Sequence, residues 1–173
     1  MEADRRDLTR FKKLTDRDMD NIKIRRINKM NRSEMAVNKF KEGYNCAQSV
    51  LFCYADDLNI SQDHALRIAT GFGAGMGRKQ EVCGAISGGI LVLNHVYGRG
   101  ENEDKQKQDL TYSKVRELID EFEKKYGTVN CKKLLDGCEL LTPEGQEQFS
   151  KKSLIEDCYE YVEYTVTLLD ELI

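Results

Sequence analysis

The chain has 173 residues, of which 40% are hydrophobic and 33% charged, and its formal net charge is −3. A chain of this length can bury a hydrophobic core as one domain, and its near balance of charges argues against a protein built to coat nucleic acid or acidic lipid. No apolar run approaches the about 18 residues that a membrane helix needs, so we expect no membrane span.

The N-terminal 32 residues differ in composition from the rest of the chain. They hold 11 Lys or Arg against six Asp or Glu and carry few apolar anchors. We expect residues 1–32 to form a basic, partly helical extension, without nucleic-acid binding, and residues 33–173 to form the folded domain. The first residues, MEADRRDLTR, lack the apolar core of a secretory signal, so we expect a cytoplasmic protein whose thiols stay reduced.

Two helices are predicted before the glycine-rich stretch. Apolar residues spaced three and four apart run from Val37 to Leu58, which is the pattern of one amphipathic helix. Residues 61–72 predict a second helix, with Ser61 as its N-cap and Ile68 on its inward face. The glycines of GFGAGMG then end this helix in a turn.

The segment after this turn, CGAISGGILVLNHVYG, is apolar nearly all round. A helix with this pattern is usually buried on every side. Its glycines, alanine and serine are small enough to let a neighbouring backbone approach closely. We therefore predict a buried central helix over residues 83–98.

The rest of the chain predicts further helices. An amphipathic helix over 110–126 is closed by Gly127 as a left-handed cap. A short helix over 130–137, a proline-containing connection over 138–153 and a last helix over 155–173 follow. Nothing alternates with the period of a strand. We predict an all-α fold, a compact bundle of about five to seven helices with a Gly-rich turn before the buried central helix.

Six cysteines are spread along the chain without a CxxC pair. Cys46 and Cys53 lie about two helical turns apart, or ~10 Å, which is too far for a disulfide or for one metal ion to join them. A cysteine taken singly is more often a buried apolar residue than a reactive one, and we expect this role for Cys53 and Cys138. The six are Cys46, Cys53, Cys83, Cys131, Cys138 and Cys158.

Cys83 and Cys131 fall at the starts of predicted helices. Unpaired backbone N–H groups and the positive end of the helix dipole favour a thiolate there, so we expect both thiols to be unusually acidic and to be the candidate redox thiols. Cys46 and Cys158 lie within predicted helices, where we expect ligands or resolving partners.

The glycine-rich turn predicts backbone contacts to an anion. Gly71, Gly73, Gly75 and Gly77 permit positive φ angles, and such a turn can direct N–H groups at a phosphate, a thiolate or the sulfides of a cluster. No Gly-Lys-Ser/Thr follows, and a helix rather than a strand precedes the turn, so nucleotide-binding loops fit poorly.

Four stretches of the sequence resemble the C_GCAxxG_C_C family of small, mostly helical redox-active proteins. They are, in this order, GYNCAQSVL, ALRIATGFGAGMGRKQEVCGAISGGILVLNHVYGR, NCKKLL and DCYEYV. The resemblance implies a redox role, and one related domain is similar to part of a multihaem cytochrome with an iron–sulfur centre. It assigns four motif cysteines and the CGAxxG glycines and alanine to this chain: Cys46, Cys83, Cys131 and Cys158, with Gly84, Ala85 and Gly88.

We hypothesise that the four motif cysteines meet at one end of the bundle, with the backbone of Gly73, Gly75, Gly77 and Gly84 in contact with a bound group. Four thiolates in an apolar setting repel one another, so they need a cation, a cluster or oxidation in pairs. An iron–sulfur cluster that exchanges electrons with a redox partner protein is the first hypothesis, as an electron-transfer component or oxidoreductase.

Three alternatives stay open. Dithiol–disulfide exchange requires two of these cysteines within bridging distance and one exposed thiolate. Zinc held by four thiolates would give a structural or sensing element without redox chemistry. A helical interaction protein, as a homodimer through the apolar 83–98 helix, would use its cysteines only for packing.

Overall fold

The structure is a computed structural model that describes residues 32–173, so the extension predicted for residues 1–32 lies outside the described residues apart from Arg32. The described residues form helices and loops with no strand, and the predicted all-α fold is confirmed. A helix over 32–41 comes first. It is followed by α2 (Cys46–Phe52), α3 (Gln62–Ala69), the 3-10 helix η1 (Thr70–Phe72), α4 (Gly73–Met76), α5 (Gly84–Tyr97), α6 (Lys105–Tyr126), α7 (Cys131–Leu134), α8 (Pro143–Lys151) and α9 (Ile155–Leu172).

Helix α5 is the centre of the bundle, and the predicted buried central helix is confirmed. Its residues 84–89 are all buried. A Cβ on Gly88 would lie 2.7 Å from the carbonyl oxygen of Ala47 in α2, and one on Gly89 would lie 2.9 Å from Leu118 in α6. The glycines therefore let both neighbours approach α5 closely. This face of α5 is therefore covered by α2 and α6 of the same chain.

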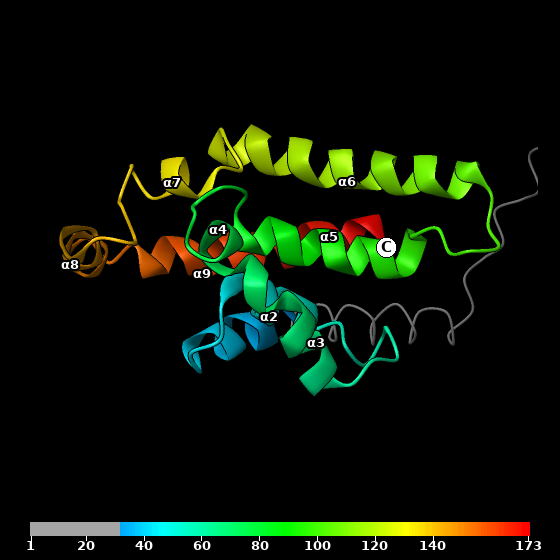
Figure 1. Ribbon diagram of the computed structural model, residues 1–173, viewed down its shortest axis with the longest axis horizontal. Coiled ribbons are helices and arrows are strands. Elements are labelled where there is room, and N and C mark those ends of the chain that lie inside the picture. Colours follow the sequence, from blue (N-terminus) through cyan, green and yellow to red (C-terminus); the bar gives the residue numbers. More distant parts are fainter. Residues whose placement is uncertain (1–31) are drawn as a thin grey trace, which may run out of the picture.

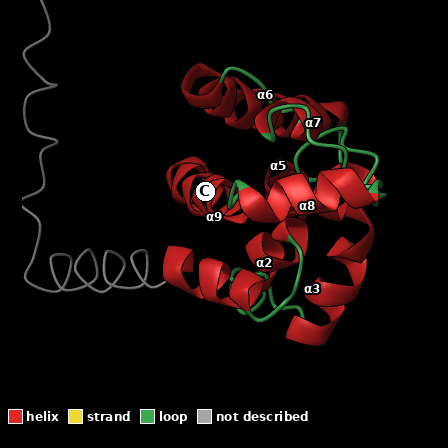
Figure 2. Cartoon of the chain, turned by 90° about the vertical axis from the view of Figure 1, so that its left-hand side faces the viewer, coloured by secondary structure: helices red, strands yellow, loops and turns green. Residues whose placement is uncertain are grey.

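The other long helices surround α5 (Figure 1). Helix α6 runs along one side of α5, α2 and α3 lie on the other side, and α9 packs against both α5 and α6. Figure 2 looks at the end of the bundle where α8 lies across the other helices. The start of α5, the end of α6 and the start of α9 lie at this end, together with the short α4 and α7 (Figure 1).

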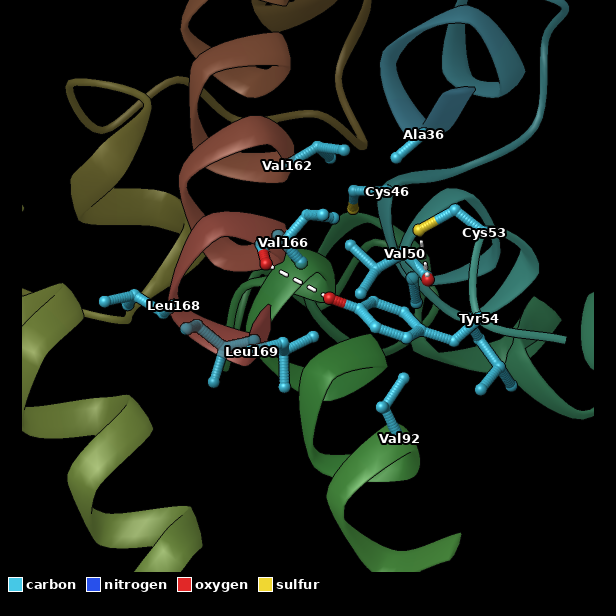
Figure 3. Close-up of a cluster of buried hydrophobic side chains, with 14 of the residues drawn as sticks. Ala36, Cys46, Val50, Cys53, Tyr54, Val92, Val162, Val166, Leu168 and Leu169 are labelled. Atoms are coloured by element: carbon cyan, nitrogen blue, oxygen red, sulfur yellow. Dashed lines mark hydrogen bonds between the residues drawn. The ribbon is translucent and has the colours of Figure 1, made fainter. Parts of the chain in front are cut away.

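The core joins α2, α5 and α9 through apolar side chains (Figure 3). Val50, Val92 and Val166 are fully buried in it. The hydroxyl of Tyr54 reaches across this layer and lies 3.1 Å from the carbonyl oxygen of Val166. This hydrogen bond satisfies a buried polar group, which would otherwise destabilise the fold by about 1–3 kcal/mol.

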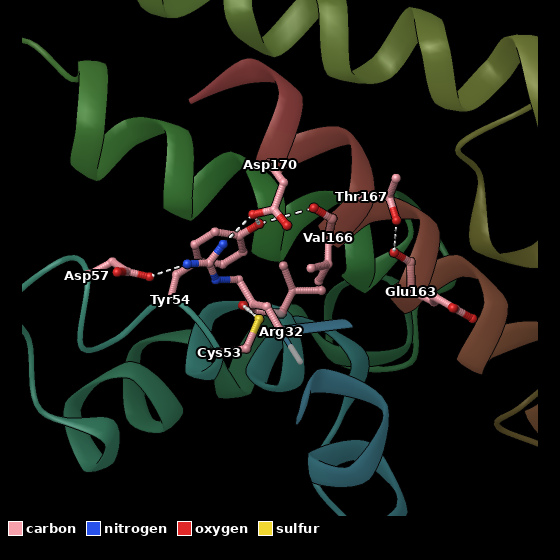
Figure 4. A network of polar contacts seen from close by, with 9 residues as sticks. Arg32, Cys53, Tyr54, Asp57, Glu163, Val166, Thr167 and Asp170 are labelled. Atoms are coloured by element: carbon pink, nitrogen blue, oxygen red, sulfur yellow. Dashed lines mark hydrogen bonds and ion pairs between the residues drawn. The ribbon is translucent and has the colours of Figure 1, made fainter. Parts of the chain in front are cut away.

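Arg32 fastens the first described helix to the end of α9 (Figure 4). Its guanidinium contacts Asp170 and lies 2.7 Å from Asp57 Oδ2, with its carbon 4.7 Å from the ring centroid of Tyr54. The side chain of Asp170 is only 5% exposed, and the Tyr54 hydroxyl lies 3.0 Å from its Oδ1. Charge-assisted bonds of this kind hold three separate segments together.

The single helix predicted from Val37 to Leu58 is wrong. The chain turns at Gly43, whose φ is +99°. A new helix then starts at Asn45, whose side chain accepts from the Gln48 backbone N–H while the Gln48 side chain accepts from the Asn45 N–H. This capping box gives hydrogen-bond partners to backbone N–H groups at the start of the new helix. The apolar residues keep their helical spacing from Val37 to Leu58, although the backbone breaks between two helices. As a result Cys46 is the first residue of α2 and does not lie mid-helix.

Two further predictions need correction. The segment 138–153, predicted as a connection, contains α8, which starts with Thr142 as N-cap and a proline in its first turn. Its apolar content is too low to produce a helical stripe. With the broken first helix, α8 raises the number of helices above the prediction. The prediction that Ile68 lies on the inward face of its helix is wrong. Ile68 is 42% exposed, whereas Ala65 and Ala69 supply the buried face of α3.

No helix within residues 32–173 has the length and apolar character needed to cross a bilayer.

Replacing Gly88 by alanine tests the close contact between α2 and α5. The added methyl group would meet the Ala47 backbone, which cannot move without shifting α2, so we expect the free energy of unfolding to fall by about 1–3 kcal/mol. Urea denaturation measures this value. Gly71→Ala is the matched control, because no atom lies within 4 Å of its added Cβ. Equal stability of the two variants would contradict the account.

Candidate functional site

The four motif cysteines line one cavity at the end of the bundle, with a volume of about 180 Å³. All four sit at helix starts. Cys46 and Cys131 are the first residues of α2 and α7, Cys83 is the N-cap of α5, and Cys158 lies in the first turn of α9. The expectation that Cys46 and Cys158 lie mid-helix is therefore wrong. Four segments remote in sequence supply the sulfur atoms of this cysteine cavity.

Backbone hydrogen bonds fix Cys83 and Cys131 relative to each other. The N–H of Cys83 donates to the carbonyl oxygen of Val129 at 2.7 Å, and the N–H of Cys131 donates to that of Glu81 at 2.6 Å. Val82 pairs with Asn130 between them as an isolated antiparallel bridge. This short pairing holds the loop before α5 against the loop before α7 without a sheet.

Two of the predicted glycines pack directly against motif cysteines. A Cβ on Gly84 would lie 2.3 Å from the sulfur of Cys46, and one on Gly75 would lie 2.8 Å from the Cβ of Cys131. Neither position therefore admits a side chain without displacing a cysteine. Gly73 packs against the side chain of Asn45, and the Gly77 N–H donates to the Gly73 carbonyl instead of pointing at an anion.

The glycine-rich segment forms a left-handed turn over residues 74–80. The prediction of positive φ holds for Gly75 and Gly77 but is wrong for Gly73, whose φ is −62°, and for Gly71. Non-glycine residues adopt the positive angles instead, with φ of +50° at Ala74, +64° at Met76, +69° at Arg78 and +59° at Gln80. Each costs roughly 1–2 kcal/mol, so the surrounding structure must impose this turn.

Gln80 is the residue that anchors the left-handed turn. Its buried side chain donates to the carbonyl oxygen of Cys138 at 2.6 Å and accepts from the N–H of Leu140 at 2.8 Å. Its own carbonyl oxygen accepts from the side chain of Asn130, the N-cap of α7. These bonds tie the turn to both sides of the segment that carries Cys131.

Burial sets the ionisation of the motif cysteines. Desolvation raises the pKa of the Cys46 thiol, raises that of Cys83 well above its ordinary value, and raises that of Cys131 to about 12. It also raises the pKa of Cys158, where the charges of Cys46, Cys131 and Asp157 add to it. The expectation that Cys83 and Cys131 are unusually acidic is therefore wrong for the free thiols, because burial outweighs the helix start.

Backbone N–H groups act against the effect of desolvation on the pKa of Cys46. N–H groups of Ala74, Ala47 and Gly84 favour its thiolate, although desolvation remains the larger influence on its pKa. These amides come from the left-handed turn, from α2 and from α5. The site thus combines an apolar setting with N–H groups that could stabilise negative charge on sulfur.

The other two cysteines lie outside the cavity, as predicted. Cys53 is buried in the core, where its thiol lies 3.1 Å from the carbonyl oxygen of Val50 (Figure 3). Cys138 is fully buried and its thiol lies 3.0 Å from the carbonyl oxygen of Gly145. Both act as small packing residues that donate a hydrogen bond to the backbone.

The cavity wall carries other side chains besides the motif cysteines. Within residues 32–173 no three His, Cys, Asp or Glu side chains stand in an arrangement that could hold a metal ion. Besides Asn45, the N-cap of α2, three polar residues that the sequence analysis did not assign to the site line the cavity: Arg78, Gln146 and Tyr161. Tyr161 is oriented by a hydrogen bond of 3.1 Å to the Leu134 carbonyl. Arg78 and Tyr161 lie within two of the family-like stretches but are not part of the cysteine and glycine pattern, and Gln146 lies outside those stretches, so the sequence does not single them out.

A family model described as "Putative redox-active protein (C_GCAxxG_C_C)" matches residues 44–172. The chain belongs to this family. The match contains all four motif cysteines and confirms the resemblance seen in the sequence. No curated protein and no solved structure is significantly similar to the chain. The family description supports a redox role for this C_GCAxxG_C_C protein. The four cysteines of the family pattern line the cysteine cavity.

The buried thiols predict how stability depends on pH. The pKa of a cysteine thiol in the unfolded chain is about 8.5. A thiol with a higher pKa in the folded chain keeps its proton at a pH where the unfolded chain has released it. Its contribution to the free energy of unfolding is therefore complete below about pH 8.5 and is lost as the pH rises. For the reduced, metal-free chain we expect the free energy of unfolding to fall between pH 8 and about 9.5, by about 1.4 kcal/mol per pH unit for each such thiol.

Urea denaturation across this pH range measures the effect. Cys131→Ala removes one of the raised groups and should make the slope shallower by up to one proton. A free energy of unfolding that stays constant from pH 7 to about 9.5 would contradict the burial of these thiols.

Proposed function

We propose that this protein transfers electrons through an iron–sulfur cluster held by Cys46, Cys83, Cys131 and Cys158. The observation that carries the proposal is that these four cysteines, from four separate segments, line one cavity. Cysteine thiolates are the usual ligands of iron–sulfur clusters. The other two cysteines of the chain are engaged in packing elsewhere.

The size of the cavity favours a cluster over one metal ion. A single zinc ion requires all of its sulfur ligands at about 2.3 Å from one point. The motif cysteines line a cavity of about 180 Å³, which has room for a group larger than one ion. Ala74 and Gly84 supply N–H groups near Cys46, and hydrogen bonds to sulfur tune the potential of such clusters.

The protonation of the thiols favours a metal-containing group over dithiol–disulfide exchange. Exchange needs a thiolate at neutral pH, whereas burial raises the pKa of all four motif cysteines. Binding of a metal cation replaces the thiol protons and removes the repulsion between thiolates. The chain's own contribution is to hold four sulfur atoms in place, to exclude water around three of them and to offer N–H groups.

When bound, an iron–sulfur cluster would supply one-electron transfer. The electron would come from one redox partner protein and go to another, with no bond made or broken in the polypeptide. Cys158 is half-buried while the other three motif cysteines are buried. The α9 side of the cavity is therefore the side from which a partner would approach most closely.

Anaerobic purification followed by iron, zinc and sulfide analysis tests the proposal. We expect a broad absorption band near about 400 nm and about one acid-labile sulfide per iron. Cys83→Ser and Cys131→Ser should each lose most of the iron and the band. A colourless protein with one zinc per chain would contradict the proposal in favour of a structural zinc site.

Cys53→Ser and Cys138→Ser are the matched controls. Both remove a buried thiol outside the cavity, so they should keep the iron content of the parent protein even where they lower its stability. Loss of the cluster in these variants, with retention in Cys83→Ser and Cys131→Ser, would overturn the assignment of the ligands.

A further inference from the structure

Arg78 is the one charged side chain among the described residues that line the cysteine cavity. The rest of the wall beyond the motif cysteines is mostly apolar, and Leu140, Phe149 and Ile155 form part of it. Arg78 itself is exposed. The described wall of the cavity therefore carries one charged residue, and it is a cation.

No ion pair joins Arg78 to another residue within 32–173. Some basic side chains of nearby segments do have such partners: Lys132 pairs with Glu139, Lys151 with Glu147, and Lys152 with Asp136. The neighbouring Lys79 has no ion pair within 32–173 either, but it does not line the cavity. The charge of Arg78 is thus available to something that is not part of the described chain. An arginine that interacts with a small anion needs this availability.

The backbone fixes the position of Arg78. Its φ of +69° lies in the left-handed region, which costs roughly 1–2 kcal/mol for a residue with a side chain. The turn is closed around it by hydrogen bonds from Lys79 N–H to the Met76 carbonyl at 3.2 Å and from Glu81 N–H to the Gly75 carbonyl at 3.1 Å. Strain of this kind is concentrated at ligand clamps and active sites.

The motif thiols do not use the charge of Arg78. The charges that shift the pKa of Cys83, Cys131 and Cys158 come mainly from other motif cysteines, with Asp157 also acting on Cys158. The main opposing influences on the pKa of Cys46 are backbone N–H groups. Arg78 is therefore not a main cause of the ionisation of these sulfur atoms.

We propose that the cysteine cavity binds a small organic anion, whose charged group is held by Arg78 and whose apolar body lies against Leu140, Phe149 and Ile155. The half-buried Cys158 lines the same chamber. The inference rests on the proposed function only for its choice of site, and it concerns the cysteine cavity when no cluster fills it. It does not depend on a bound cluster and is tested on the reduced, metal-free full-length chain.

Two alkylating reagents of nearly equal size separate the effect of reagent charge from the accessibility of the Cys158 thiol. Iodoacetate is an anion and iodoacetamide is neutral; with each, the Cys158 thiolate forms a bond to the methylene carbon and iodide leaves, after the thiol proton has passed to the buffer. The rate at Cys158 is measured by peptide mass spectrometry at one fixed pH. The quantity compared between proteins is the ratio of the iodoacetate rate to the iodoacetamide rate.

Arg78→Gln should lower this ratio by about two- to five-fold, the range expected for an exposed ion pair, while the iodoacetamide rate stays the same. Arg78→Lys should keep most of the ratio, and about 0.5 M salt should lower it in the parent protein. Lys79→Gln is the control, because this neighbouring exposed cation does not line the cavity and should leave the ratio unchanged.

Three results would overturn the inference. They are an unchanged ratio in Arg78→Gln, an equal fall in Lys79→Gln, and an equal fall in both reagent rates. Failure of the iron and sulfide analysis would contradict the cluster while leaving this anion preference intact, so the two proposals fail separately.

Discussion

Desolvation of four cysteine thiols around one cavity is the constraint on which the rest of the site depends. Backbone N–H groups at helix starts favour the thiolates of Cys46 and Cys83, yet burial has the larger effect and raises the pKa of both thiols. An arrangement of this kind is poorly suited to a free nucleophile. It is well suited to a cationic group that replaces the protons and shares the charge among the sulfur atoms.

The close approach of the cysteine segments depends on missing side chains. Gly84 leaves room for the sulfur of Cys46, Gly75 leaves room for Cys131, and Gly88 lets α2 lie against α5. The CGAxxG motif is thus a packing device as much as a chemical one: its cysteine lines the cavity, while its glycines bring a second cysteine to it. The strained turn over 74–80 has a related role, because it carries Ala74 and Arg78 to the cavity wall.

The sequence was sufficient to predict the helical class, the buried α5 and the packing roles of Cys53 and Cys138, because these follow from local periodicity and from the preference of thiols for the interior. It failed where a local capping signal overrides a continuous apolar stripe, as at Asn45, or where a helix such as α8 has little apolar content. Arg78 and Gln80 could not be predicted, because their positive φ angles are imposed by tertiary hydrogen bonds. The pKa of Cys83 could not be predicted, because the balance between desolvation and backbone N–H groups depends on the tertiary fold.

Diffraction from crystals of anaerobically prepared protein, recorded on both sides of the iron absorption edge, is the most direct test of the central claim. The account predicts one compact group of iron atoms inside the cavity, bonded to the sulfur atoms of Cys46, Cys83, Cys131 and Cys158. Iron bound elsewhere on the chain, or four sulfur atoms that face separate parts of the interior, would contradict it.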